Sequence, residues 1–131
     1  MTSGTVNPVS PNKIRVAAAQ VNTTVGDIDG NTRLIEKWIK LSQDQQAELV
    51  AFPELTITCY PPEDLVLYDN FITANKIALS RIAAKVENIV ALVGFVDYED
   101  GRLFNSAAVL HQGKIVTTYR KIPLPNYGVF D

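Results

Sequence analysis

Residues 49–65 read Leu-Val-Ala-Phe-Pro-Glu-Leu-Thr-Ile-Thr-Cys-Tyr-Pro-Pro-Glu-Asp-Leu, and this stretch predicts both a buried strand and a site. The apolar run from Leu49 to Phe52 has the length and composition of a strand. Pro53 disfavours helix at Phe52, so we expect the strand to continue up to Glu54 and to present it at its carboxyl end. In an open α/β layer, ligands bind at that end of the strands.

Glu54 is a single carboxylate in an apolar segment, because the nearest charged residues in the sequence are Glu48 and Glu63. A carboxylate that is taken out of water is costly unless a positive charge or hydrogen-bond donors compensate it. Glu54 therefore predicts a partner from elsewhere in the chain. A structural acid that caps a turn is the alternative, and the residue alone does not decide between the two.

The composition is that of a soluble globular domain, since 47% of the 131 residues are hydrophobic and 20% are charged. The net charge of -2 includes no basic run, which argues against nucleic acid or an anionic membrane as a partner. We find no transmembrane stretch and no signal peptide, so the expected location is cytoplasmic. Residues 1–12 are polar and aperiodic, and they predict a flexible lead-in.

One cysteine and one histidine limit the metal and redox chemistry that the chain can support. Cys59 cannot form an internal disulfide, and His111 cannot build a zinc site alone. His111 also falls at the edge of a predicted turn, where a structural role is expected. No metal site is therefore predicted.

The predicted elements follow the order strand, helix, strand, helix and then three strands that form a meander, which indicates a mixed α/β sheet. The first helix should begin near residues 27–31 and pack through Leu34, Ile35, Trp38, Ile39 and Leu41; the second should begin at Asp69. Asp-Gly and Gln-Gly pairs at 100–101 and 112–113 predict tight turns. The strands are expected at 14–21, 49–52, 89–96, 103–111 and 114–119, with 89–96 in the centre.

Lys121 is the second candidate site residue. Pro123 and Pro125 follow it and fix the path of the chain, so we expect the last strand to leave the sheet at Lys121. The ammonium would then be held at a strand end, near the end that presents Glu54. The alternative is a solvated Arg120–Lys121 pair, which the residues alone favour slightly.

Phe52-Pro-Glu-Leu55 followed by Tyr119-Arg-Lys121 resembles the nitrilase superfamily of carbon–nitrogen hydrolases, whose site is a Glu, Lys and Cys triad. Within this superfamily, residues 60–65 (Tyr-Pro-Pro-Glu-Asp-Leu) and 124–131 (Leu-Pro-Asn-Tyr-Gly-Val-Phe-Asp) resemble the amino-terminal glutamine amidotransferase domain of glutamine-dependent NAD+ synthetases. The resemblance implies that residues 13–131 form the amino-terminal part of a nitrilase-like, four-layer α/β/β/α sandwich, apparently truncated.

The resemblance also implies roles for individual residues. Glu54 is expected to act as general base, Lys121 to stabilise the oxyanion, and Tyr127 to contact the glutamine substrate. Glu63 and Asp64 are expected to be loop and helix-start residues. Cys59 stands where the family usually carries glycine, and we expect a small buried thiol there, strained if its φ is positive, rather than a nucleophile.

The nucleophilic cysteine of the family is expected some tens of residues after Lys121, beyond Asp131, so the 131-residue chain alone is expected to be inactive. The amidase part implies no cofactor, whereas ATP and Mg2+ are expected for an absent carboxyl-terminal synthetase domain that amidates deamido-NAD. The expected partners are glutamine, that domain and further copies of the chain as a homo-oligomer. A free-standing nitrilase-like amidase and a non-catalytic scaffold domain are the alternatives.

Overall fold

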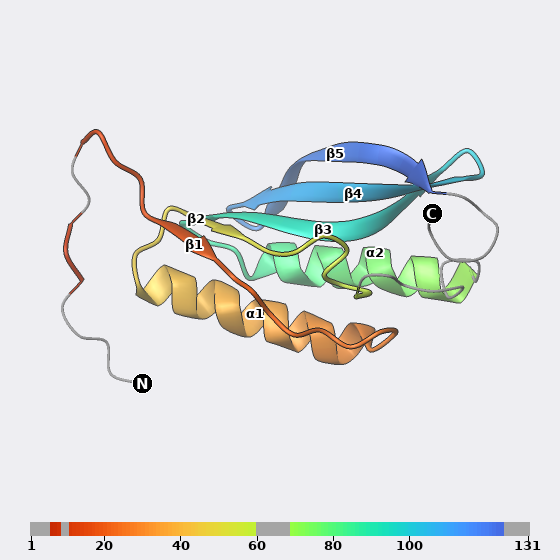
Figure 1. The fold of residues 1–131 in the computed structure, drawn as a ribbon, viewed down its shortest axis with the longest axis horizontal. Coiled ribbons are helices and arrows are strands. Elements are labelled where there is room, and N and C mark those ends of the chain that lie inside the picture. Colours follow the sequence, from red (N-terminus) through yellow and green to blue (C-terminus); the bar gives the residue numbers. More distant parts are fainter. Residues whose placement is uncertain (1–5, 9–10, 60–68, 125–131) are drawn as a thin grey trace.

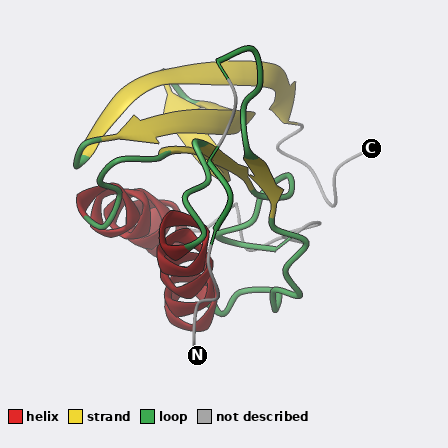
Figure 2. Ribbon diagram, turned by 90° about the vertical axis from the view of Figure 1, so that its left-hand side faces the viewer, coloured by secondary structure: helices red, strands yellow, loops and turns green. Residues whose placement is uncertain are grey.

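The computed structural model describes residues 6–8, 11–59 and 69–124, and within these residues five strands form one sheet beside two helices (Figure 1). Figure 2 shows both helices on the same side of the sheet. This arrangement confirms the predicted α/β class with a mixed sheet. The described residues make one helix layer and one sheet layer, and the other two layers of the predicted sandwich stay a prediction.

The strands lie side by side in the order in which they occur in the chain. The first three are parallel neighbours, and the last three form an antiparallel meander, as the two turn signals predict. The central position of the third strand is also confirmed. The strand bounds are β1 Val16–Ala18, β2 Leu49–Ala51, β3 Val90–Glu99, β4 Arg102–His111 and β5 Lys114–Leu124.

Two-residue turns join the strands of the meander. Asp100 and Gly101 have φ values of 53° and 77°, and Gln112 and Gly113 have φ values of 49° and 78°. Consecutive positive φ values match the right-handed twist of the flanking strands, which is why Asp-Gly is a strong hairpin signal. The predicted turns are therefore confirmed at both positions.

The two helices pack on the sheet through one face each. Helix α1 (Ile28–Asp44) begins after Asp27, whose carboxylate accepts a hydrogen bond of 3.0 Å from the Gly30 N–H. Helix α2 (Asp69–Ala84) is described from Asp69 onward, and because residues 60–68 lie outside the described ranges, the role of Asp69 as its cap stays a prediction. The core between helices and sheet includes Ile35, Ile39, Leu79, Ile82, Val50, Val93, Phe95 and Leu110.

Trp38 differs from the prediction, because its side chain is 39% exposed rather than packed in the core. The buried face of α1 is formed by Asn31, Thr32, Ile35, Ile39 and Ser42. Trp38 instead lines a shallow hollow with residues 17–20, at the β1 edge of the described sheet. Periodicity predicts an apolar stripe, but the neighbours that cover the stripe are set by the tertiary fold.

The predicted end of the last strand is wrong. β5 does not leave the sheet at Lys121 but pairs with β4 as far as Leu124, whose register partner is Leu103. Proline removes a donor from a strand, and it is tolerated here because β5 is an edge strand of the described sheet. Pro123 therefore continues the strand instead of ending it.

Several predictions fall wholly or mostly on residues that the structure does not describe. Most of the predicted lead-in lies outside the described residues, so residues 1–12 stay predicted as a lead-in. Residues 60–68 and 125–131, which include Glu63, Asp64 and Tyr127, lie outside them as well. Neither described helix combines the length and the apolar character needed to cross a membrane.

Candidate active site

The loop after β2 holds Glu54 against the central strand. The Phe52 N–H donates to the Leu92 carbonyl at 3.0 Å, and the Ile57 N–H donates to the Gly94 carbonyl at 3.4 Å. The Thr56 hydroxyl donates to the Pro53 carbonyl and closes the turn. Because β2 pairs with β3 only as far as Ala51, this loop occupies the edge of β3 where β2 has ended.

Gly94 permits the close approach of this loop to β3. A Cβ atom built at Gly94 would lie 2.4 Å from the Leu55 nitrogen and 2.7 Å from the Pro53 oxygen. Both distances are shorter than a carbon atom tolerates, so the loop can rest here only on a residue without a side chain. Glu54 lies between these two backbone contacts, and its position therefore depends on Gly94.

Lys121 reaches the site from a bulge in β5. Ser106 of β4 is paired with Arg120, whereas the preceding residue, Asn105, is paired with Ile122. Lys121 is therefore the extra residue of a bulge between these two pairs. A bulge of this kind re-aims a side chain without ending the strand. At Lys121, where the sequence predicts the end of the strand, the structure has a bulge and the strand continues.

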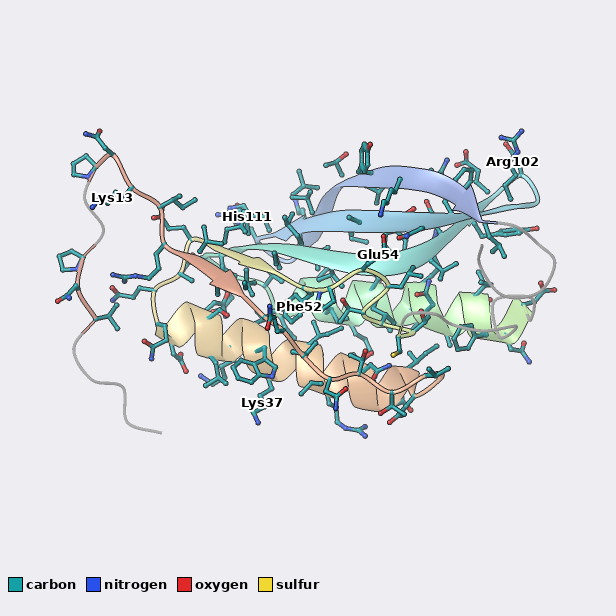
Figure 3. The ribbon with its side chains drawn as sticks, viewed as in Figure 1. Lys13, Lys37, Phe52, Glu54, Arg102 and His111 are labelled. Carbon is teal, nitrogen blue, oxygen red and sulfur yellow. The ribbon has the colours of Figure 1, made fainter. Side chains whose placement is uncertain are left out.

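The structure brings Glu54 and Lys121 into direct contact, as the sequence predicts. Lys121 Nζ donates a hydrogen bond of 2.6 Å to Glu54 Oε1. Both residues line a hollow of about 250 Å³ together with Gly94, Asn105 and Tyr119. Figure 3 shows Glu54 beside the central strands, between His111 toward one end of the sheet and Arg102 at the other. The catalytic roles of Glu54 and Lys121 stay predictions.

The charge state of Glu54 follows from its neighbours. The hydrogen bond from Lys121 lowers the pKa of Glu54, partial burial opposes this effect, and the Asn105 side chain and the charge of Lys121 lower the pKa further. The net result is a pKa below the ordinary value, so the carboxylate is ionised at neutral pH and able to accept a proton. The side chains of Glu54 and Lys121 are 37% and 60% exposed, so water and solutes can reach the pair.

Asn105 is a site residue that the sequence analysis missed. It is 5% exposed and lines the hollow from β4, opposite Val96 of β3. An amide among the mainly apolar residues of this strand is a signal that could have identified it, because a buried amide needs hydrogen-bond partners.

Arg120, the residue before Lys121, has acidic partners of its own. Arg120 Nε lies 3.0 Å from Asp97 Oδ2, and Arg120 Nη1 lies 3.1 Å from Glu99 Oε2. The alternative of a solvated Arg120–Lys121 pair is therefore wrong, since each cation has a different carboxylate partner. The sequence analysis missed Asp97, which directly follows the apolar run of β3.

Cys59 and His111 have contacts that fit structural roles. Cys59 has a φ of 69°, as expected where the family carries glycine, and its thiol lies 3.4 Å from the Thr23 carbonyl oxygen. It is half-buried rather than buried as predicted. His111 Nδ1 lies 2.9 Å from the Ile89 carbonyl oxygen. Within the described ranges, no group of three or more His, Cys, Asp or Glu side chains could hold a metal ion.

Comparisons with known proteins show which family this chain is similar to. A family model described as carbon-nitrogen hydrolase matches residues 15–130. The glutamine-dependent NAD(+) synthetase of Thermotoga maritima is 42% identical over 121 residues, and the match covers 91% of this chain and 21% of the relative. The corresponding protein of Xanthomonas campestris is 44% identical over 124 residues, covering 94% of this chain and 22% of the relative. The chain thus spans about a fifth of the length of these relatives.

Solved structures give the same result. The glutamine-dependent NAD+ synthetase from Acinetobacter baumannii has a TM-score of 0.80 and 40% identity, with 90% of this chain and 22% of that chain covered. An amidase from Nesterenkonia sp. has a TM-score of 0.75 with 23% identity, and the match covers 95% of this chain and 48% of that chain. The second likeness is one of fold alone.

Proposed function

Because this chain belongs to the carbon-nitrogen hydrolase family, we propose that it supplies Glu54 and Lys121 to the glutamine-hydrolysing site of a longer, glutamine-dependent NAD+ synthetase. The observation that carries the proposal is the 2.6 Å contact between Lys121 Nζ and Glu54 Oε1 at a hollow that solutes can reach. The names of the relatives support the choice of glutamine as substrate.

In the first step, Glu54 accepts the proton of a cysteine thiol, and the thiolate attacks the carboxamide carbon of glutamine. From the family resemblance, we expect this cysteine to follow Lys121 in the sequence. The carbon–sulfur bond forms while the carbonyl oxygen becomes an oxyanion. The acceptor role requires the ionised form of Glu54, and the hydrogen bond from Lys121, which lowers the pKa of Glu54, favours that form before the thiol arrives.

In the second step, the ammonium group of Lys121 stabilises the oxyanion. When the tetrahedral intermediate collapses, the carbon–nitrogen bond breaks and Glu54 gives its proton to the departing nitrogen, which leaves as ammonia. Water then attacks the thioester while Glu54 accepts one of its protons, and glutamate is released as the thiol is restored. Protons and bonds balance over the cycle with no external oxidant or reductant.

The proposal extends to parts of the site and the protein that the described residues do not include. Tyr127 contacts the glutamine. The released ammonia is used by a synthetase domain that amidates deamido-NAD with ATP and Mg2+, and the protein is a cytoplasmic homo-oligomer. The family resemblance supports the roles of Tyr127 and of the synthetase domain, whereas the cytoplasmic location and the homo-oligomer are expectations from the sequence alone.

Ammonia release from glutamine by the complete protein tests the proposal. We expect Glu54→Gln and Lys121→Met each to reduce kcat for ammonia release by about a hundredfold or more, since each removes a group that acts in the transition state. Glu87→Gln and Lys85→Met make the same changes at exposed positions away from the hollow and should leave the rate unchanged.

Synthesis of NAD from added ammonium chloride serves as the folding control, because it bypasses glutamine. It should survive both site variants. A Glu54→Gln protein that still releases ammonia from glutamine at the wild-type rate would contradict the proposal. Ammonia release from small amides without any ATP-dependent NAD synthesis would indicate a free-standing amidase instead.

A further inference from the structure

Arg120 is held on three sides by residues that lie outside the hollow. Its Nε and Nη2 atoms lie 3.0 Å and 2.9 Å from Asp97 Oδ2, and Nη1 lies 3.1 Å from Glu99 Oε2. The guanidinium carbon is also 4.6 Å from the centre of the Phe104 ring. A planar guanidinium that meets carboxylates and an aromatic face together has little freedom to move.

Asp97 is the fixed point of this cluster. It is 4% exposed, and its other oxygen, Oδ1, accepts hydrogen bonds from Lys76 Nζ at 2.8 Å and from the Tyr98 N–H at 2.9 Å. Burial by itself raises the pKa of Asp97, but Lys76, Arg120 and the Tyr98 N–H lower it more, so the group is ionised. A buried carboxylate strongly disfavours any arrangement that removes one of its cations. Asp97 therefore keeps Arg120 in place.

Arg120 is the residue immediately before the bulge. Lys121 is the extra residue of the bulge, so the direction of its side chain depends on how the neighbouring residues are fixed. Arg120 is hydrogen-bonded to Asp97, which is in turn hydrogen-bonded to Lys76 of α2. Lys121 extends instead to Glu54 in the loop after β2. Arg120 and Lys121 are adjacent in the chain, but they pair with carboxylates in different parts of the fold: Arg120 with Asp97 of β3, and Lys121 with Glu54 of the loop after β2.

We propose that Asp97 is a positioning residue for the candidate active site, because it anchors Arg120 and thereby fixes the bulge that presents Lys121 to Glu54. Asp97 does not line the hollow and is not a catalytic residue. Its effect on activity passes through Arg120 and Lys121, and the activity readout below rests on the proposed function.

Removing the anchor should change both the position of Lys121 and the pKa of Glu54. Two side chains face Glu54 here: Lys121 from β5 and the uncharged Asn105 from β4. If the anchor is removed, the bulge relaxes and Lys121 spends less time against Glu54. The pKa of Glu54 then returns toward its ordinary value, because the hydrogen bond from Lys121 is the largest cause of its depression. The acid limb of the pH profile for glutamine hydrolysis should move to higher pH.

The test compares Arg120→Met and Asp97→Asn with Lys76→Met in the complete protein. Lys76→Met is the matched control, because it also removes a cation from Asp97 but lies on α2 rather than on the bulged strand. For Arg120→Met and Asp97→Asn we expect kcat for ammonia release to fall about tenfold or more. We also expect the acid limb of kcat/KM to rise by about half a pH unit or more. Lys76→Met should lower the thermal midpoint without moving the acid limb.

Two further variants separate positioning from general destabilisation. The double variant should be no worse in kcat than Arg120→Met alone, since Asp97 acts through Arg120. Arg120→Lys keeps a charge for Asp97 and should recover part of the rate, and it serves as the readout if Arg120→Met does not fold. Variants that lower the thermal midpoint but keep the wild-type acid limb and kcat would overturn the proposal.

A crystal structure of the Arg120→Met protein gives a readout that does not depend on glutamine. We expect the Lys121 Nζ to Glu54 Oε1 distance to lengthen beyond hydrogen-bond range, to about 4 Å or more. An unchanged contact would overturn the positioning role. A wild-type protein that releases no ammonia from glutamine would instead refute the proposed function, while the crystallographic distance would still test the anchor.

Discussion

Lys121 Nζ lies 2.6 Å from Glu54 Oε1, although 67 positions separate the two residues in the chain. The contact depends on two departures from a regular sheet. One is the loop that takes over the edge of β3 after β2 ends, and the other is the extra residue in β5. Each departure can be altered without replacing either member of the pair.

Gly94→Ala should displace the loop that holds Glu54. The new Cβ would meet backbone atoms of Leu55 and Pro53 at 2.4 Å and 2.7 Å, and backbone cannot rotate away as a flexible side chain can. We expect the free energy of unfolding to fall by about 1–3 kcal/mol, as for other overpacked sites. We also expect a strong loss of ammonia release. Thermal unfolding and the glutaminase assay of the complete protein measure the two effects.

Gly101→Ala is the matched control for this substitution. It adds the same methyl group at a position where nothing lies within 4 Å, but where the φ of 77° strains any other residue. It should therefore lower stability by about 1 kcal/mol and leave ammonia release intact. Equal losses of activity in both glycine variants would show that activity follows stability rather than the position of Glu54.

Lys121→Met should destabilise the protein in a pH-dependent way. Lys121 lowers the pKa of Glu54 below its ordinary value of 4.5, so the pair stabilises the fold above about pH 4.5 and loses this contribution as the pH falls further. Because both side chains are more than a third exposed, we expect a difference of about 0.2–1 kcal/mol at pH 7. Thermal midpoints of wild type and variant should converge below pH 4.5.

Lys85→Met provides the reference for the pH series, because Lys85 is an exposed residue of the connection after α2. Its midpoint should stay close to that of the wild type at every pH. A gap between wild type and Lys121→Met that is the same at pH 7 and at pH 3.5 would mean that the ion pair does not stabilise the fold.

Local sequence signals predict much of the fold, because they act within a few residues. Asp27 caps α1 at the expected place, and the apolar run that became β3 lies in the centre of the described sheet. The turns at 100–101 and 112–113 need positive φ, and their residues tolerate it. Each of these features is decided by chemistry that neighbouring residues supply.

The features that complete the site are not local. The prolines after Lys121 indicate an exit from the sheet, but the edge position of β5 lets the strand continue, and the bulge follows from its register with β4. Asp97 and Asn105 are buried polar residues of β3 and β4, and their partners are known only once the strands are paired. The sequence could therefore predict that Glu54 and Lys121 meet, but not how.

Asn75→Leu should weaken the support of the edge of β3 beyond the end of β2. The buried Asn75 amide donates to the Val96 carbonyl and accepts from the Val96 N–H at 3.3 Å, in place of a neighbouring strand. Leucine leaves both backbone groups buried without these partners, at about 1–3 kcal/mol each. The thermal midpoint should fall sharply. Asn70→Leu on the exposed side of α2 is the control, and an equally small effect of both changes would contradict this role.

Cys59→Gly should preserve both activity and stability, because Cys59 is expected neither to act as the nucleophile nor to suit its backbone conformation. Its φ of 69° strains a residue with a side chain, whereas glycine adopts it without cost. We expect Cys59→Gly to be more stable than Cys59→Ala by about 1 kcal/mol, since alanine keeps the strain. Thermal midpoints of the two variants provide the comparison.

Ammonia release from glutamine should continue in both Cys59 variants, since Cys59 is not expected to be the nucleophile and its thiol, which lies 3.4 Å from the Thr23 carbonyl oxygen, is half-buried. The rate of Cys59→Gly relative to Glu54→Gln is the informative comparison, because the two residues lie five positions apart in one loop. If the Cys59 variants lose activity as completely as Glu54→Gln while remaining folded, the thiol would have to be the nucleophile. The catalytic cysteine would then have to be sought in this loop instead of after Lys121.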